Sequence, residues 1–264
     1  MLELKNLYKT FNPGTINAKT ALNGLSLTLE KSEFVTVIGG NGAGKSTMLN
    51  AVAGTLNVDD GEVFIDSMDV TDLPEYKRAS FIGRVFQDPM MGTAPSMHIE
   101  ENLALAARRG QKRGLRWGVS KEERETYRKL LSSLGLGLET RLSTEVSTLS
   151  GGQRQALTLL MATLKSPKLL LLDEHTAALD PKTAAKVMEL TDRIVNEEKL
   201  TTLMITHNMR DAIQYGNRLV MLHEGRVILD ISGEEKKNLT VTDLLAEFAK
   251  ASGDEFSSDR ALLS

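Results

Sequence analysis

Residues Gly39–Ser46 read GGNGAGKS, and this stretch decides the fold class of the chain. It fits the pattern G-x-x-x-x-G-K-[ST], in which the backbone N–H groups of a glycine-rich loop surround phosphate oxygens. The apolar run Phe34–Ile38 precedes it and the helix-like stretch Thr47–Ala53 follows it, which is the strand–loop–helix context that the pattern requires. We therefore interpret it as a phosphate-binding loop rather than as an accidental glycine-rich turn.

The chemistry of this loop follows from its residue types. Lys45 is predicted to place an ammonium charge near the terminal phosphates, and the Ser46 hydroxyl can ligate Mg²⁺. The helix that begins here adds its positive N-terminal end. The residues predicted to bind the nucleotide in this segment are Gly39, Asn41, Gly42, Ala43, Gly44, Lys45, Ser46 and Thr47.

Composition limits the remaining possibilities. The chain has 264 residues, of which 41% are hydrophobic, enough for one sizeable α/β domain with an inserted subdomain. A formal net charge of -3 gives no electrostatic reason to expect nucleic-acid binding. The absence of cysteine excludes disulfides and thiolate metal sites. The sequence shows no signal peptide and no run that could span a bilayer, so we expect a soluble protein or one held at a membrane by a partner.

Strand-like and helix-like segments alternate along the chain, and this alternation predicts a mainly parallel sheet. The pattern becomes mostly helical between residues 89 and 164, which we interpret as an inserted helical subdomain. Residues 1–88 and 165–250 are then the nucleotide-binding core of a single domain spanning 1–250. Residues 251–264 form a polar tail.

Two acids end the most apolar run of the chain, Leu169–Leu172. A carboxylate at the carboxyl end of a parallel strand lies at the edge of the sheet where ligands bind. Asp173 is therefore predicted to hold Mg²⁺, directly or through water, and Glu174 to act as general base on an attacking water. The alternative is a strand that simply ends in solvated acids, which becomes unattractive beside a phosphate loop.

A second candidate anion site lies at Leu149–Gln153, which reads LSGGQ and precedes a helical run. A serine hydroxyl and glycine N–H groups at a helix N-terminus can bind an anion. The alternative is an ordinary helix cap with a flexible turn. One chain thus carries two separate phosphate-binding termini, although a single nucleotide has only one γ-phosphate.

The order of these motifs resembles the ATP-binding-cassette ATPases that drive membrane transporters, over nearly the whole chain up to about Asp230. The resemblance implies an α/β fold, a P-loop NTPase core with a mainly parallel sheet, an antiparallel β subdomain and the helical insert. The LSGGQ stretch is the family signature and adds Ser150, Gly151, Gly152 and Gln153 to the predicted ATP contacts. Ala178–Asp180 matches the segment that communicates across a dimer.

Three further site residues come from this resemblance. Gln87 matches the glutamine that links Mg²⁺ and the attacking water to the transporter contact, and His207 matches the switch histidine near the γ-phosphate. Phe11 falls where the family usually has a tyrosine that stacks on adenine. His98, His175 and His223 have no metal-ligand spacing, and we interpret them as structural or surface residues.

The resemblance implies hydrolysis of ATP with Mg²⁺ in a head-to-tail dimer of two copies, with each Lys45 opposite the partner copy's Ser150. It also implies transmembrane permease subunits, an extracytoplasmic solute-binding protein acting indirectly, and a location at the cytoplasmic face of the membrane. The predicted function is uptake of an amino acid or similar small solute. The alternatives are an exporter ATPase, a soluble ATPase acting on DNA or ribosomes, and a small-molecule kinase.

Two surfaces are candidates for membrane-side contacts. Met90, Met91, Met97 and the helix near Leu103 are predicted to line a groove for a permease helix. A basic stretch could meet anionic lipid headgroups or could be a solvated loop. Its residues are Arg108, Arg109, Lys112, Arg113, Arg116 and Trp117.

Overall fold

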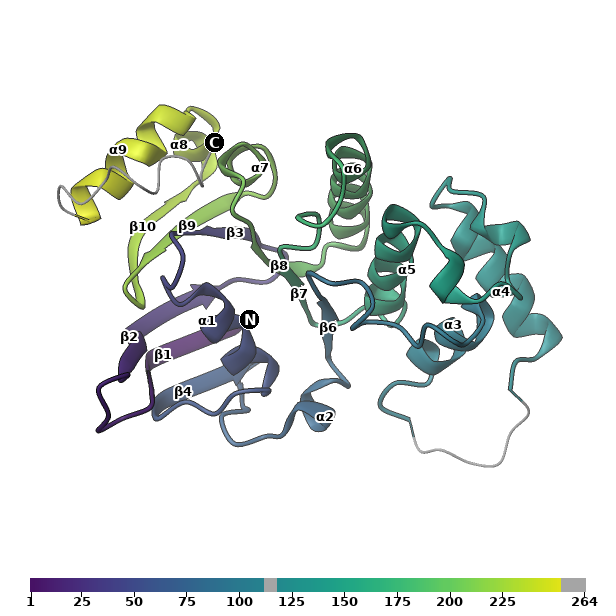
Figure 1. The fold of residues 1–264 in the computed structure, drawn as a ribbon, viewed down its shortest axis with the longest axis horizontal. Coiled ribbons are helices and arrows are strands. Elements are labelled where there is room, and N and C mark those ends of the chain that lie inside the picture. Colours follow the sequence, from purple (N-terminus) through teal and green to yellow (C-terminus); the bar gives the residue numbers. More distant parts are fainter. Residues whose placement is uncertain (112–117, 253–264) are drawn as a thin grey trace. The chain divides into compact units, whose positions relative to one another are not determined.

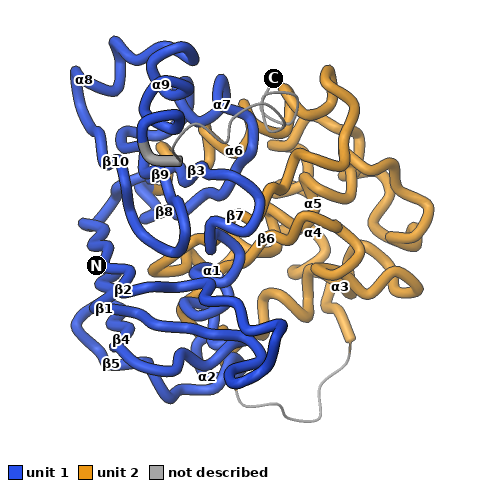
Figure 2. Tube along the Cα trace, turned by 60° about the vertical axis from the view of Figure 1, so that its left-hand side comes forward, with its two compact units in different colours: residues 1–78, 199–264 blue, residues 79–198 orange. Residues whose placement is uncertain are grey.

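The computed structural model of the chain describes residues 1–111 and 118–252. It divides into two compact units: unit 1 comprises residues 1–78 and 199–264, and unit 2 comprises residues 79–198 (Figure 2). The predicted helical insert, residues 89–164, lies within unit 2. The predicted polar tail lies outside the described residues from residue 253 onward.

Unit 1 contains the predicted antiparallel subdomain. Its strands are β1 (Leu2–Phe11), β2 (Lys19–Leu29), β4 (Asp60–Ile65) and β5 (Met68–Asp69), in the order β2-β1-β4-β5. Leucines at alternate positions of β1 and β2 are buried, because successive side chains of a strand point to opposite faces. This part of the predicted fold is confirmed.

The strand before the phosphate loop lies between parallel neighbours in unit 1. β3 (Phe34–Ile38) pairs in parallel with β8 (Thr201–Ile205) and with β9 (Arg218–His223), and β10 (Arg226–Ser232) pairs antiparallel with β9. All five residues of β3 are buried, as expected for a central strand covered on both faces. The carboxyl ends of β3 and β8 therefore lie at the same edge.

The helices of unit 1 are α1 (Lys45–Ala53), α2 (Glu75–Arg78), α7 (Met209–Gln214), α8 (Gly233–Lys237) and α9 (Val241–Ser252). Figure 1 shows α7, α8 and α9 beside β9 and β10. The last two helices were not predicted, although the spacing of Val241, Leu244, Leu245 and Phe248 is helical. Leu244 and Phe248 pack against Leu219 and Met221 of β9, which explains why this segment folds.

A buried arginine fixes the far end of α1. Arg78 is 2% exposed, and its Nη1 donates to the carbonyls of Ala51 (2.8 Å) and Val52 (2.9 Å). These carbonyls lie in the last turn of the helix, where backbone acceptors have no partner within the helix. Arg78 thus holds the C-terminal end of the helix that carries Lys45.

The described residues of unit 2 form one parallel strand pair and four α-helices. β6 (Ile82–Val85) pairs with β7 (Leu169–Asp173), with Ile82 opposite Leu169. The helices are α3 (Ile99–Ala107), α4 (Lys121–Ser132), α5 (Gly151–Thr163) and α6 (Pro181–Glu198), and η1 (Leu138–Thr140) and η2 (Val146–Thr148) are short 3₁₀ turns.

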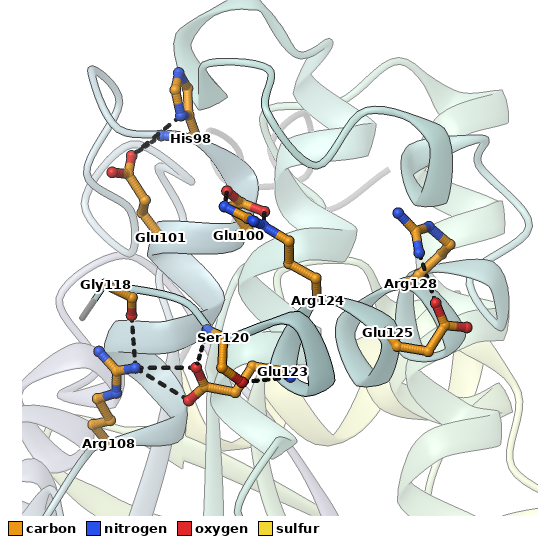
Figure 3. A network of polar contacts seen from close by, with 10 residues as sticks. All are labelled: His98, Glu100, Glu101, Arg108, Gly118, Ser120, Glu123, Arg124, Glu125 and Arg128. Atoms are coloured by element: carbon orange, nitrogen blue, oxygen red, sulfur yellow. Dashed lines mark hydrogen bonds and ion pairs between the residues drawn. The ribbon is translucent and has the colours of Figure 1, made fainter. Parts of the chain in front are cut away.

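Ion pairs connect α3 to α4 (Figure 3). Glu100, which is buried on α3, accepts two hydrogen bonds from Arg124 of α4, at 2.7 and 2.9 Å. Arg108, one of the predicted basic residues, donates to Glu123 at 3.1 Å. Lys112, Arg113, Arg116 and Trp117 lie outside the described residues, so contact of the basic stretch with lipid stays a prediction. Over residues 1–111 and 118–252, no helix is long and apolar enough to cross a membrane.

Candidate functional site

The phosphate loop of unit 1 has a backbone that only glycine accommodates at two points. Gly44 precedes α1 with φ +101°, and a Cβ there would lie 2.4 Å from the carbonyl oxygen of Ala21. A Cβ on Gly39 would lie 2.3 Å from the carbonyl oxygen of Leu222. Because both obstacles are backbone atoms, a larger residue would force the loop out of shape.

Lys45 begins α1 and is only 8% exposed. Its Nζ donates to the carbonyl oxygens of Gly39 (2.7 Å) and Gly40 (3.2 Å), so the ammonium lies within the loop itself. The first turn of α1 contains no acidic residue and, among the described residues, no side chain caps its N-terminus. The positive end of the helix is therefore not neutralised locally, which favours an anion.

A turn far along the sequence supports the loop. Gly225, between β9 and β10, donates from its N–H to the carbonyl of Ala43 (3.0 Å) and accepts from the N–H of Asn23 (3.1 Å). A Cβ on Gly225 would lie 2.7 Å from the carbonyl of Ala21. Sequence reasoning missed this positioning role, although Glu224-Gly225 between two apolar runs is a hairpin signal.

His207 follows β8 and is exposed at the edge where the phosphate loop starts. The preceding residue, Thr206, donates from its N–H to the carbonyl of Val37 on β3 (3.1 Å), which holds the two strand ends together. Asn208 caps α7 by accepting from the N–H groups of Arg210 and Asp211. Burial raises the pKa of Asp211, and the nearby His207 opposes this shift.

Phe11 ends β1 and is 38% exposed. The Nζ of Lys9 lies 6.0 Å from the ring centroid, and Lys9 is also tied to Asp59 by a 2.6 Å contact. An exposed ring with a cation beside it can stack on a base. Stacking on adenine remains a prediction.

The two acids of unit 2 lie where the sequence predicted. Asp173 is the last residue of β7, and Glu174 follows with φ +44°, a left-handed conformation that is uncommon for glutamate. The carbonyl of Glu174 accepts from the N–H of Ala177 (2.9 Å), which closes a tight turn. Gln87 is exposed two residues beyond β6. Since β6 and β7 are parallel neighbours, the structure brings Gln87, Asp173 and Glu174 to one edge of unit 2.

The three histidines without a proposed catalytic role, His98, His175 and His223, have structural contacts. His175 is buried against α6, with Nε2 3.0 Å from the hydroxyl of Thr191, and burial lowers its pKa to about 4, so it is neutral at neutral pH. His98 donates its N–H to Glu101 at the start of α3. The His223 ring makes an edge contact with Phe248 at 5.8 Å between centroids.

Asp180, in the predicted dimer-communicating segment, caps α6. Its Oδ1 accepts from the N–H of Thr183 at 3.1 Å, and hydrogen bonding to Thr183 lowers the pKa of the Asp180 carboxyl. Asp180 is therefore a charged acceptor at the start of the helix that supports the signature turn.

The signature turn is a capped helix start. The Ser150 hydroxyl accepts from the N–H of Gln153 (3.3 Å), and the Ser150 N–H donates to the Gln153 side chain (3.2 Å), which forms a capping box at the start of α5. The ordinary-cap interpretation is thus correct as far as it goes, and Ser150 remains exposed. A cavity of about 640 Å³ lies beside the turn, between α5 and α6.

Gly152, the second glycine of this turn, has no room for a side chain against α6. A Cβ on Gly152 would lie 2.2 Å from Cγ2 of Thr183 on α6, whereas one on Gly151 would lie 3.2 Å from the end of the Leu179 side chain. The Gly152 backbone therefore approaches α6 closely.

Within the described residues, no group of three or more His, Asp or Glu side chains could hold a metal ion by itself.

Comparison with known proteins agrees with this arrangement. The family model described as ABC transporter matches residues 22–177. The chain is 49% identical, over 95% of its length and 100% of the relative's, to a tyrosine transport ATP-binding protein of Clostridioides difficile. It is 31% identical, over 90% of its length and 81% of the relative's, to an energy-coupling factor transporter ATP-binding protein of Clostridium acetobutylicum.

Solved structures are similar over most of the chain. A dimeric ATP-binding cassette in a post-hydrolysis state bound to ADP and phosphate is 32% identical, with a TM-score of 0.75 over 88% of this chain and 98% of the other. An ATP-binding cassette in its ADP conformation is 26% identical, with a TM-score of 0.76 over 94% of this chain and 98% of the other. The predicted P-loop NTPase fold is thereby confirmed. The chain belongs to the ABC transporter family, as an ATP-hydrolysing cassette.

Proposed function

We propose that this cassette powers the uptake of an amino acid, with tyrosine as the first candidate, through separate permease subunits. The relative that supports this solute class shares 49% of its residues with the chain over the relative's full length, and its name states tyrosine transport. An extracytoplasmic solute-binding protein would deliver the solute. The cassette would then sit at the cytoplasmic face of the membrane, attached through the permease.

The proposed mechanism rests on two different glycine-rich turns, one on each unit, that each open a helix. The loop around Lys45 lies within unit 1, and the exposed residue Ser150 begins the turn that opens α5 of unit 2. A head-to-tail pair of copies would use both turns on each nucleotide, twice and reciprocally. Two solved structures of a cassette that is 32% identical to the chain are dimeric, which supports this arrangement.

The reaction is phosphoryl transfer from ATP to water. Lys45 stabilises negative charge developing on the terminal phosphate, and the Glu174 carboxylate accepts the proton of the attacking water. Gln87 and His207 orient the water and the γ-phosphate. Gly39, Asn41–Thr47 and, from the other copy, Ser150–Gln153 bind the phosphates, while Phe11 stacks on the base.

The metal proposal agrees with the donors present. Mg²⁺ prefers few protein oxygens together with phosphate oxygens and water, and no described cluster of acids competes with such a site. Ser46, Gln87 and Asp173 are the residues proposed to hold it. When bound, Mg²⁺ neutralises charge on the β- and γ-phosphates.

The permease surface is proposed to lie on unit 2 beyond Gln87. Met90 and Met91 are exposed there, and Leu105 is an exposed leucine on α3. Leu103 of the same helix is fully buried, so the helix would present Leu105 rather than Leu103 to a partner. Exposed methionines adapt to a partner helix at little cost.

A hydrolysis-deficient variant tests the dimer. Glu174→Gln removes the base but no phosphate ligand, so Mg-ATP should convert the monomer to a stable dimer in light scattering while ATP turnover is lost. Adding Ser150→Arg should leave nucleotide binding intact and abolish that dimer. A Glu174→Gln protein that stays monomeric with Mg-ATP, alone and with its permease, would refute the proposed mechanism.

Transport tests the solute. Proteoliposomes containing the permease complex, loaded with ATP inside, should accumulate labelled L-tyrosine supplied with the binding protein. Complexes carrying Lys45→Ala should not accumulate it. Uptake of a different amino acid alone would keep the transport function and reject tyrosine.

A further inference from the structure

An arginine on β6 lies beside the proposed metal acid. Nη2 of Arg84 is 3.6 Å from Oδ2 of Asp173, and the two side chains are 13% and 17% exposed. The register places Arg84 opposite Leu171, so Asp173, two residues further along β7, extends from the same face as Arg84. The proximity is therefore built into the strand pairing.

The same guanidinium contacts the segment that carries Gln87. Its Cζ lies 4.6 Å from the centre of the Phe86 ring, within the range of a cation–π interaction. The carbonyl of Phe86 in turn accepts from the Gln155 side chain of α5 (3.3 Å), which anchors this segment. Arg84 thus touches both the strand end that bears Asp173 and the residue before Gln87.

Charge decides what this contact does. The Arg84 guanidinium balances the negative charge of the largely shielded Asp173 carboxylate. The same positive charge repels an approaching divalent cation, and at a few ångströms in a partly buried site this repulsion exceeds that between exposed groups. A distance of 3.6 Å is an ion pair rather than a close hydrogen bond, so the carboxylate can exchange partners.

We infer that Arg84 is a positioning residue that serves as the counter-ion of Asp173 until the metal binds, and that the metal then takes over this role. The inference rests on the proposed role of Asp173. Metal binding would weaken the ion pair between Arg84 and Asp173. The contact of Arg84 with Phe86, the residue next to Gln87, would remain. The site therefore binds the metal less tightly than it would if Asp173 had no arginine beside it.

The affinity of fluorescent mant-ADP, measured with Mn²⁺ and separately with EDTA, tests this without turnover. We define the coupling ratio as the dissociation constant in EDTA divided by the dissociation constant with Mn²⁺. This ratio reports how strongly metal and nucleotide favour each other's binding. Arg84→Met, which keeps the length but removes the charge, should raise this ratio about tenfold. Arg84→Lys should stay within about twofold of the natural protein, because it keeps a positive charge beside Asp173.

Two controls separate the possible failures. Arg128→Met removes another arginine of unit 2, paired with Glu125 at the surface, and should leave the ratio unchanged (Figure 3). Asp173→Asn should lower the ratio to about one, because the metal would no longer support nucleotide binding. If the ratio stays high, the proposed metal role of Asp173 fails. If Asp173→Asn collapses the ratio while Arg84→Met leaves it unchanged or lowers it, the counter-ion role is wrong and the proposed function stands.

Discussion

The phosphate loop, Gly39–Ser46, and the signature turn, Ser150–Gln153, are both glycine-rich segments that open a helix, yet they are built differently. The loop wraps its own lysine, which donates to the carbonyls of Gly39 and Gly40. The turn satisfies its own helix start through a reciprocal pair of bonds between Ser150 and Gln153.

The glycines of the two segments also meet different obstacles. A side chain on Gly44 would strike a backbone carbonyl, whereas one on Gly152 would strike a methyl group of Thr183. The loop is therefore shaped by the main chain of unit 1, and the turn is shaped by side-chain packing on α6. Three substitutions probe this difference, taken from the largest expected effect to the smallest.

Gly44→Ala should abolish nucleotide binding. The residue has φ +101° and its new Cβ would lie 2.4 Å from the carbonyl of Ala21, so strain and collision together should cost about 3 kcal/mol of stability and distort the loop. Mant-ADP titration and thermal unfolding measure both effects. Gly14→Ala is the matched control, since Gly14 also has positive φ (+76°) but a Cβ there meets nothing within 4 Å. Binding by Gly44→Ala at the level of the control would contradict this account.

Gly152→Ala should destabilise the protein by about 2 kcal/mol, because the new methyl would overlap Cγ2 of Thr183. Thr183→Ser removes that carbon, so the double variant should regain most of the loss in chemical denaturation. The Thr183→Ser single variant provides the reference for the double-mutant cycle. No such rescue is expected for Gly44→Ala. An additive double variant would show that the contact between α5 and α6 does not require this glycine.

Ser150→Ala should cost about 1 kcal/mol through loss of the cap of α5. Ser120→Ala is matched to it, because Ser120 and Glu123 form the same capping box at the start of α4 (Figure 3). Both variants should lose similar stability in urea unfolding. In the Glu174→Gln background, only Ser150→Ala should weaken the dimer formed with Mg-ATP. If both variants form the same amount of dimer, Ser150 acts only as the cap of α5.

Several elements could be predicted from the sequence because the patterns that indicate them involve only neighbouring residues. The apolar run before Gly39, the acids after Leu172 and the serine before α5 each combine a periodic pattern with an adjacent polar residue of specific chemistry. The strands around them formed where the alternation predicted. Helix α9 was missed because packing of Leu244 and Phe248 on β9 makes it fold. The five-residue helix α8 was missed as well.

The amino-acid sequence alone determined the fold class and the local patterns of the proposed site, because phosphate loops, acid-ended strands and capped helix starts depend on neighbours along the chain. Gln87, His207 and Phe11 were instead proposed through the family resemblance. Only the tertiary structure placed Gly225 under the loop, Thr183 against Gly152 and Arg84 beside Asp173. Those contacts depend on strand register and helix packing between distant segments, which no local pattern specifies.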